Sequence, residues 1–117
     1  MLETTKNRIS EQKVWMKYYA NDVAQQPIPK MTAYKYLLTE NSKGPDNNAL
    51  NFMGAKTTYR ELFDSIEACA NAFSSMGVKQ GDLVSFLTIA TPHSIAALYA
   101  LNKLGATANM IDPRMDV

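Results

Sequence analysis

Glycine is scarce in this 117-residue chain, and each glycine stands apart from the others. The five positions are Gly44, Gly54, Gly77, Gly81 and Gly105. A loop that cradles phosphate needs two or three glycines close together, so that backbone N–H groups can approach the anion. The sequence therefore lacks a glycine-rich phosphate-binding loop, and we interpret each glycine as a break between secondary-structure elements.

Cysteine, net charge and long apolar runs are also nearly absent. The single cysteine, Cys69, excludes an internal disulfide and is typical of a reducing compartment. The net charge is only +1, and the basic residues form no stripe of the kind that binds nucleic acid. The longest apolar run, residues 95–101, is far shorter than the roughly 20 residues that cross a bilayer. The polar N-terminus is unlike a signal peptide, so we expect a cytoplasmic protein with no transmembrane segment and no nucleic-acid partner.

The chain is long enough for one modest core, and its hydrophobic content of 46% is ordinary for a globular domain. We expect residues 1–30 to form an N-terminal helix, from Ser10 to about Ala20, and then a proline-containing linker. Residues 31–117 are expected to form the folded domain.

A short helix and a hairpin are predicted at the start of that domain. Thr32 has the position of a helix N-cap. Residues 49–53 and 56–58 are short strand candidates that are expected to join at Gly54-Ala55. Glycine supplies the positive φ that a tight hairpin needs at its first turn position.

The longest predicted helix covers residues 59–76. Thr58 and Glu61 have the spacing of a capping box at its head, and Gly77 is expected to end it in the left-handed conformation. Its apolar residues recur at i+3 and i+4, which predicts one face against a core. These residues are Leu62, Ile66, Ala70 and Phe73.

A strand, a helix and a second strand follow. Residues 83–89 are apolar at nearly every position, which predicts a strand with both faces covered. Thr91 and Pro92 begin a helix that is apolar around most of its circumference and ends at Gly105, and residues 106–111 form the next strand. This order predicts an α/β fold, with an N-terminal hairpin, β–α–β crossovers, a parallel sheet and helices on both faces.

Three candidate chemical residues each have a structural interpretation, which we favour. His93 could act as an acid or base, or lie on the surface of a first helical turn. Cys69 could be a nucleophile, or a buried and inert thiol. Asp112 could lie at the ligand edge of the sheet, or begin the turn after the strand.

Other groups are likewise expected to have structural roles. Glu61 and Asp64 form a carboxylate pair on one helix, but capping explains Glu61 better. Three tyrosines that could stack bases have no basic groove beside them, and are expected to pack instead. They are Tyr34, Tyr36 and Tyr59. The seven methionines are expected mostly in the core or at element ends. No nucleophile, base and orienting group form a set in the sequence, so we predict no catalytic, cofactor-binding or metal-binding residue.

Three segments in a fixed order resemble a known family. Residues 57–62 are similar to the first core motif of the adenylate-forming (AMP-binding) superfamily, which includes acyl-CoA synthetases, luciferases and peptide-synthetase adenylation domains. Residues 101–106, followed by Ile111-Asp112-Pro113, resemble the second motif, and residues 76–84 resemble the link between the two. The resemblance covers about residues 31–114.

The resemblance has departures and omissions. The family usually has Pro-Asn where this chain has Ile89 and Ala90, and a basic residue where this chain has Leu83. The family's phosphate-binding Ser/Thr/Gly-rich loop, aromatic-Thr-Glu motif, ribose-binding aspartate and catalytic lysine have no counterpart here. The resemblance therefore implies a partial piece of the acyl-CoA synthetase N-terminal domain, an N-terminal structural portion that is inactive by itself.

The implied parent enzyme is an ATP-dependent ligase. It would convert a carboxylate and ATP to an acyl-adenylate and then to a thioester with CoA, with Mg²⁺ as a cofactor. Residues 15–19 look more like fatty acyl-CoA ligases, which implies fatty acid metabolism. The expected partners are the remainder of the parent enzyme and a second copy of this chain, through the exposed edge of the last strand.

An autonomous, non-enzymatic α/β interaction module is the alternative. Known modules of this size carry other signals: a receiver-like domain needs an acidic cluster and a distal lysine, and a dinucleotide-binding domain needs Gly-x-Gly-x-x-Gly. The sequence has neither set.

Overall fold

The computed structural model describes residues 12–115, and the chain separates into two units, Met1–Lys30 and Met31–Val117. The first unit contains the 3₁₀ helix η1 (Val14–Tyr18) and the short helix α2 (Asn21–Ala24). The prediction of one helix up to Ala20 was wrong over the described residues, and Ser10 lies outside them. Tyr19 has an extended backbone that separates η1 from α2, and neither helix has a side-chain cap. The aromatic and β-branched residues of this segment have modest helix propensity, and they do not form one continuous helix.

The second unit begins with helix α3 (Ala33–Asn41), whose N-cap is Thr32 as predicted. The hairpin of β1 (Asn48–Phe52) and β2 (Ala55–Thr58) follows, and its strands are antiparallel.

The hairpin turn lies one residue earlier than the sequence predicted. Phe52 pairs with Ala55, so the turn residues are Met53 and Gly54, with φ of 52° and 91°. Two positive φ angles are typical of a type I′ turn, whose twist matches that of the strands. The backbone N–H of Gly54 also donates to the Asn51 side chain at 3.1 Å, so strand register and this local bond set the turn.

The long helix α4 (Tyr59–Ser75) confirms the predicted capping box. Thr58 Oγ1 accepts from the backbone N–H of Glu61 at 3.3 Å, and the Glu61 carboxylate accepts from the backbone N–H of Thr58 at 2.8 Å. Gly77 ends the helix at a φ of 93°. Val78 N–H donates to the carbonyl of Phe73, which is the bonding of a Schellman motif.

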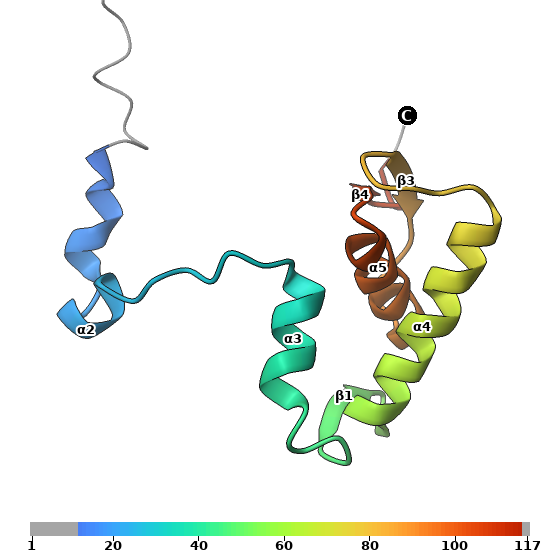
Figure 1. Ribbon diagram of the computed structural model, residues 1–117, viewed down its shortest axis with the longest axis horizontal. Helices are drawn as coiled ribbons and strands as arrows, with labels where there is room; N and C mark the ends of the chain where they lie inside the picture. Colours follow the sequence, from blue (N-terminus) through green and yellow to red (C-terminus); the bar gives the residue numbers. More distant parts are fainter. Residues whose placement is uncertain (1–11, 116–117) are drawn as a thin grey trace, which may run out of the picture. The chain divides into compact units, whose positions relative to one another are not determined.

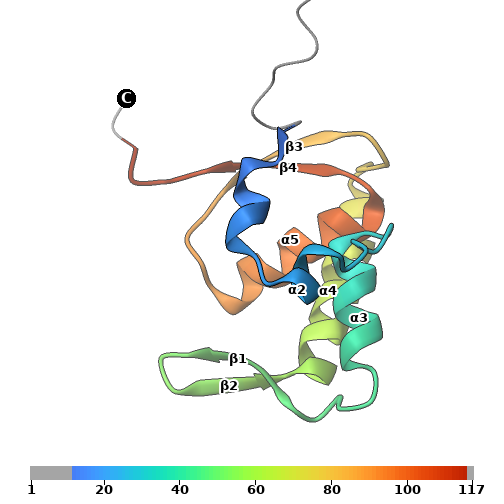
Figure 2. The same ribbon diagram turned by 90° about the vertical axis from the view of Figure 1, so that its left-hand side faces the viewer.

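Strand β3 (Leu83–Leu87), helix α5 (Pro92–Leu104) and strand β4 (Thr107–Ile111) form the predicted β–α–β crossover, because β3 and β4 pair in parallel. Thr91 caps α5 and Gly105 ends it, at a φ of 75°. The α/β class is therefore confirmed. Figures 1 and 2 show α4 and α5 side by side, with the hairpin at one end of this helix pair and the parallel strands at the other.

The core lies mainly between α4 and α5. Ile66 and Leu101 are fully buried, and the small residues of α5 allow the two helices to approach closely. The buried cluster consists of Leu62, Ile66, Ala70, Ala96 and Ala100. Within α5 only His93 and Lys103 are exposed, which confirms a helix buried on most sides.

The parallel strands differ from the prediction in one respect. The strand ends at Leu87, not at residue 89, and its alternate residues point to solvent: Leu83 is 70% exposed and Leu87 63%. The helices of the described chain pack on the other face, where Val84 and Phe86 are half-buried. Residues 31–115 therefore do not supply the expected cover on both faces of this strand, and we call the side with Leu83, Leu87 and Ile111 the outer face.

Candidate functional site

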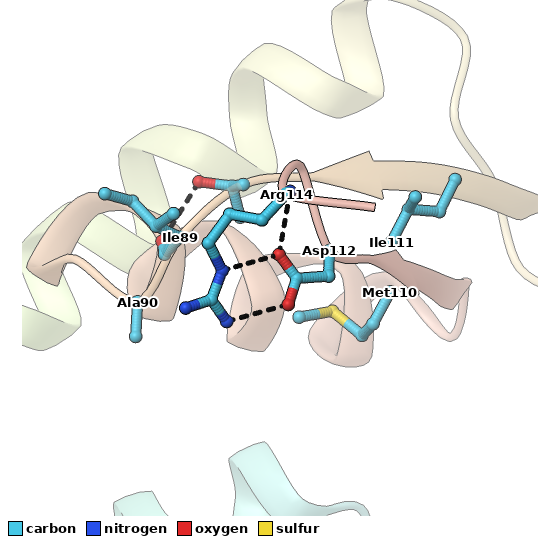
Figure 3. Close-up of a pocket in the computed structure, with 7 residues that line it drawn as sticks. Ile89, Ala90, Met110, Ile111, Asp112 and Arg114 are labelled. Atoms are coloured by element: carbon cyan, nitrogen blue, oxygen red, sulfur yellow. Dashed lines mark hydrogen bonds and ion pairs between the residues drawn. The ribbon is translucent and has the colours of Figure 1, made fainter. Parts of the chain in front are cut away.

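The carboxyl ends of β3 and β4 surround a hollow of about 520 Å³. The two strands end at register-paired residues, so the segments that follow them lie beside each other. Open α/β sheets bind ligands at this edge, which makes the hollow the candidate site. Its lining residues, drawn in Figure 3, are Thr88, Ile89, Ala90, Met110, Ile111, Asp112 and Arg114.

Asp112 and Arg114 form a two-pronged ion pair at the hollow (Figure 3). The Arg114 side chain donates from Nε to Oδ1 at 3.0 Å and from Nη2 to Oδ2 at 2.8 Å. The backbone N–H of Arg114 also donates to Oδ1, at 2.9 Å. The Arg114 side chain, followed by this N–H, lowers the pKa of Asp112.

These bonds favour the structural interpretation of Asp112. Its carbonyl accepts from the N–H of Met115 at 3.2 Å, so Asp112 begins the turn after β4. A carboxylate with a lowered pKa and both oxygens in an ion pair is a weak base. The arrangement stabilises the turn, and it pairs the two charged side chains that line the hollow with each other.

His93 and Cys69 both lie away from the hollow at the ends of β3 and β4. His93 is exposed in the first turn of α5, beside a small hollow of about 140 Å³ between the hairpin, α4 and α5. Among residues 12–115 no acid or nucleophile bonds to it. Cys69 is half-buried and packs against the core cluster. The structure places neither residue at the sheet edge.

The two carboxylates on α4, Glu61 and Asp64, do not act together on one site. The Glu61 carboxylate accepts hydrogen bonds from the N-cap residue Thr58. The backbone N–H of Thr58, followed by its hydroxyl, lowers the pKa of Glu61. Asp64 is exposed one turn further along.

The tyrosines and methionines take structural positions. Tyr59 stands against Phe63, with ring centroids 6.0 Å apart, while Tyr36 is exposed. The described methionines do not lie in the core, contrary to part of the prediction. Met53 lies in the hairpin turn and Met76 caps the end of α4; Met1 lies outside the described residues.

Sequence reasoning missed a polar tie that joins three helices. Tyr34 on α3 donates its hydroxyl to Oε1 of Glu67 on α4 at 3.0 Å, and Lys103 on α5 forms an ion pair with the same oxygen. The Lys103 ammonium also lies 5.5 Å from the Tyr34 ring centroid, within the range of a cation–π contact. The backbone N–H of Tyr34 donates to Asn102 at 2.9 Å. We call this group the three-helix tie.

The titration of the tie follows from its partners. Lys103 lowers the pKa of Glu67, and Glu67 raises the pKa of Lys103. Burial, followed by the hydrogen bond to Glu67, raises the pKa of Tyr34.

Replacing Glu67 with glutamine is expected to lower the folding stability of the chain only at pH values above the lowered pKa of Glu67. A lowered carboxyl pKa contributes stability that is present above its unfolded value and is lost as pH falls through the folded value. Since both charged groups are partly exposed, the contribution should stay under about 1 kcal/mol. Thermal unfolding midpoints of the two proteins should converge between neutral and acidic pH. A gap of constant size would show that the carboxylate does not act through its charge.

Over residues 12–115, no three His, Cys, Asp or Glu side chains lie close enough together to hold a metal ion. No helix within the same span is both long and apolar enough to cross a bilayer.

A family model described as "AMP-binding enzyme" matches residues 38–117. Among curated proteins, the long-chain-fatty-acid–CoA ligase of Bacillus subtilis is 24% identical over 106 residues, which are 90% of this chain and 19% of the ligase. A 4-chlorobenzoate–CoA ligase from an Arthrobacter species is 39% identical over 62 residues, 53% of this chain and 12% of that enzyme.

The solved structures agree with the sequence comparisons. The N-terminal subdomain of NpsA from Klebsiella oxytoca superimposes with a TM-score of 0.70 at 26% identity, covering 74% of this chain and 23% of that one. The chain spans about a fifth of the length of the B. subtilis ligase. It belongs to the family of AMP-binding enzymes, and it matches the N-terminal part of these adenylate-forming proteins.

Proposed function

We propose that this chain is the N-terminal structural portion of an ATP-dependent, AMP-forming acid–thiol ligase and that it is catalytically inactive by itself. The observation that supports this most is the role of the charged groups in the region that matches the family. Glu61 caps a helix, Glu67 ties three helices together, and Asp112 closes a turn. Each of these three carboxylates is already used by the scaffold.

The reaction that we propose for the complete enzyme needs a phosphate-binding site, and the described residues do not fit such a site. A carboxylate would attack the α-phosphate of ATP to give an acyl-adenylate and pyrophosphate, and a thiol such as that of CoA would displace AMP. Charge on the phosphates requires backbone donors, a cation and Mg²⁺. Asp112, the carboxylate at the candidate site, is paired with Arg114 through both oxygens. We therefore assign ATP, Mg²⁺ and CoA binding to the rest of the enzyme.

The proposed partner is that remainder, which would cover the outer face of β3 and β4. An exposed apolar sheet face with open edges is a common docking surface. No observation favours the alternative of an autonomous interaction module.

The acid that we propose is a fatty acid. The alignment with the long-chain-fatty-acid–CoA ligase covers 90% of this chain, so it takes in residues 15–19, whose pattern suggested this class of acid. A cytoplasmic location is proposed with it, because a single cysteine is typical of a reducing compartment.

The purified 117-residue chain is expected to show no thermal shift with ATP and Mg²⁺, and to release no AMP when a fatty acid and CoA are added. The B. subtilis long-chain-fatty-acid–CoA ligase serves as the positive control in the same buffers. A longer product of the same gene, where the reading frame continues, should release AMP. Stoichiometric ATP binding by the 117-residue chain would contradict the proposal, and so would AMP release by it.

A further inference from the structure

Helix α3 has no buried residue among its nine. Tyr34 and Leu37 are half-buried and pack against the core cluster between α4 and α5, but the cluster itself contains no residue of α3. Tyr36 and Leu38 are exposed. An isolated helix of this length is not stable in water, so α3 depends on the contacts that dock it on the other two helices.

The three-helix tie supplies the polar contacts at the N-terminal end of α3. Tyr34 is the second residue of this helix, and its backbone N–H donates to Oδ1 of Asn102 at 2.9 Å. The first N–H groups of a helix have no partner within it, so α5 completes the start of α3. The Tyr34 hydroxyl and the Lys103 ammonium both bond to Oε1 of Glu67. All four residues belong to the second unit.

The turn that follows α3 is anchored separately, on the start of α4. The backbone N–H of Tyr59 donates to the carbonyl of Asn47 at 3.0 Å. The backbone N–H of Arg60 donates to the carbonyl of Pro45 at 2.8 Å, and the Arg60 side chain pairs with Asp46 at 3.0 Å. None of these bonds involves a residue of α3, so they can persist when the helix leaves its place.

We propose that α3 is a hinged arm and that the three-helix tie is its latch: when the tie opens, α3 undocks and unfolds while α4 and α5 stay packed. The hinge is the segment Ser42-Lys43-Gly44, between α3 and the anchored turn. Elements with few buried apolar contacts are those that open locally in native proteins. Because α3 joins residues 1–30 to the helix pair, the latch controls whether that connection is fixed or loose.

The charges of the tie make the latch sensitive to pH. Among the described residues, the groups that act on the Glu67 carboxylate are the Lys103 ammonium from α5 and the Tyr34 hydroxyl from α3, and neither hairpin strand contributes one. Within α4 the neighbouring charged residue is Asp64, three residues earlier.

Acid is the condition that opens the latch. Lys103 lowers the pKa of Glu67, so the contribution of this carboxylate is present above its unfolded value and is lost as pH falls through the folded value. Glu67 raises the pKa of Lys103, so the contribution of the ammonium is lost only as pH rises through that raised value. Docking of α3 is therefore retained at neutral pH and weakened in acid.

Native-state amide exchange of the 117-residue chain measures this opening. At neutral pH the α3 amides should exchange at least about tenfold faster than the slowest α4 amides, as expected for a local opening. Their rate should not change in low urea, because undocking exposes little surface, whereas the slowest α4 amides should accelerate with urea. Glu67→Gln should speed α3 exchange about threefold, as expected for a partly exposed ion pair. The matched variant Asp64→Asn should leave α3 exchange unchanged.

A pH series gives the second readout. After correction for the intrinsic exchange rate, the protection of α3 in the unchanged protein should fall in acid to that of Glu67→Gln, with α4 still protected. The inference is overturned by α3 amides that share the urea dependence of α4, since α3 would then open only with the whole domain. Unprotected α3 amides at neutral pH would overturn it too, as would equal effects of Glu67→Gln and Asp64→Asn, or loss of α3 and α4 protection at the same pH.

Discussion

Replacing Ile66 with alanine is expected to lower the free energy of unfolding of this chain by about 3 kcal/mol. Ile66 is fully buried between α4 and α5, so the substitution removes apolar contacts and leaves a cavity. Whole small domains are stable by only about 5 to 15 kcal/mol, and a loss of this size should be visible as a large shift of the urea midpoint.

A matched substitution controls for the change in side-chain size. Ile89→Ala removes the same atoms at the end of the sheet, where the side chain is 59% exposed, and should cost well under about 1 kcal/mol. Equal losses for the two variants would mean that the core does not lie between α4 and α5.

We expect the 117-residue chain to self-associate through the sheet of β3 and β4, and we expect the double variant Leu83→Lys and Leu87→Lys to abolish association that buries the outer face. Both leucines lie on the outer face of β3, and their partners across the register are Thr107 and Ile111. A second copy that packed on this face would bury two unpaired ammonium groups, each at a cost of several kcal/mol. The dissociation constant should therefore rise by at least about 100-fold. Light scattering and sedimentation over a range of concentrations measure this.

A second double variant controls for the added charge, because it places two lysines away from the outer face. Asn71→Lys with Ser74→Lys lies on the exposed side of α4 and should associate as the unchanged protein does. A wild-type chain that stays monomeric at high concentration would contradict the prediction, and so would equal weakening by both variants.

Helix boundaries were predictable because their determinants are local. The hydrogen bonds of a capping box join residues three apart, so Thr58 and Glu61 are sufficient to mark the start of α4. Gly77 and Gly105 mark helix ends for a similar reason, since their positive φ is costly for other residues. The prediction of an N-terminal helix was wrong. It depended on Ser10 alone, with no partner residue comparable to Glu61, and the described residues that follow form η1 and α2.

The candidate site was less predictable. Asp112 was recognised as a turn residue, and its i+2 spacing to Arg114 is a local signal that could have revealed the ion pair. The three-helix tie had no such signal. Glu67 is 33 residues from Tyr34 and 36 from Lys103, and only the packing of α3, α4 and α5 brings the three side chains together.

Within residues 31–115, the amino-acid order by itself determined which segments become helices and strands, the β–α–β crossover and the motifs of the family. Those features depend on hydrophobic periodicity and on hydrogen bonds between near neighbours. The three-helix tie and the exposure of the outer face were decided by tertiary structure alone, because both depend on contacts between segments far apart in the chain. A run of apolar residues looks the same in the sequence whether one or both of its faces are covered, so only the packed structure shows that Leu83 and Leu87 of β3 are exposed.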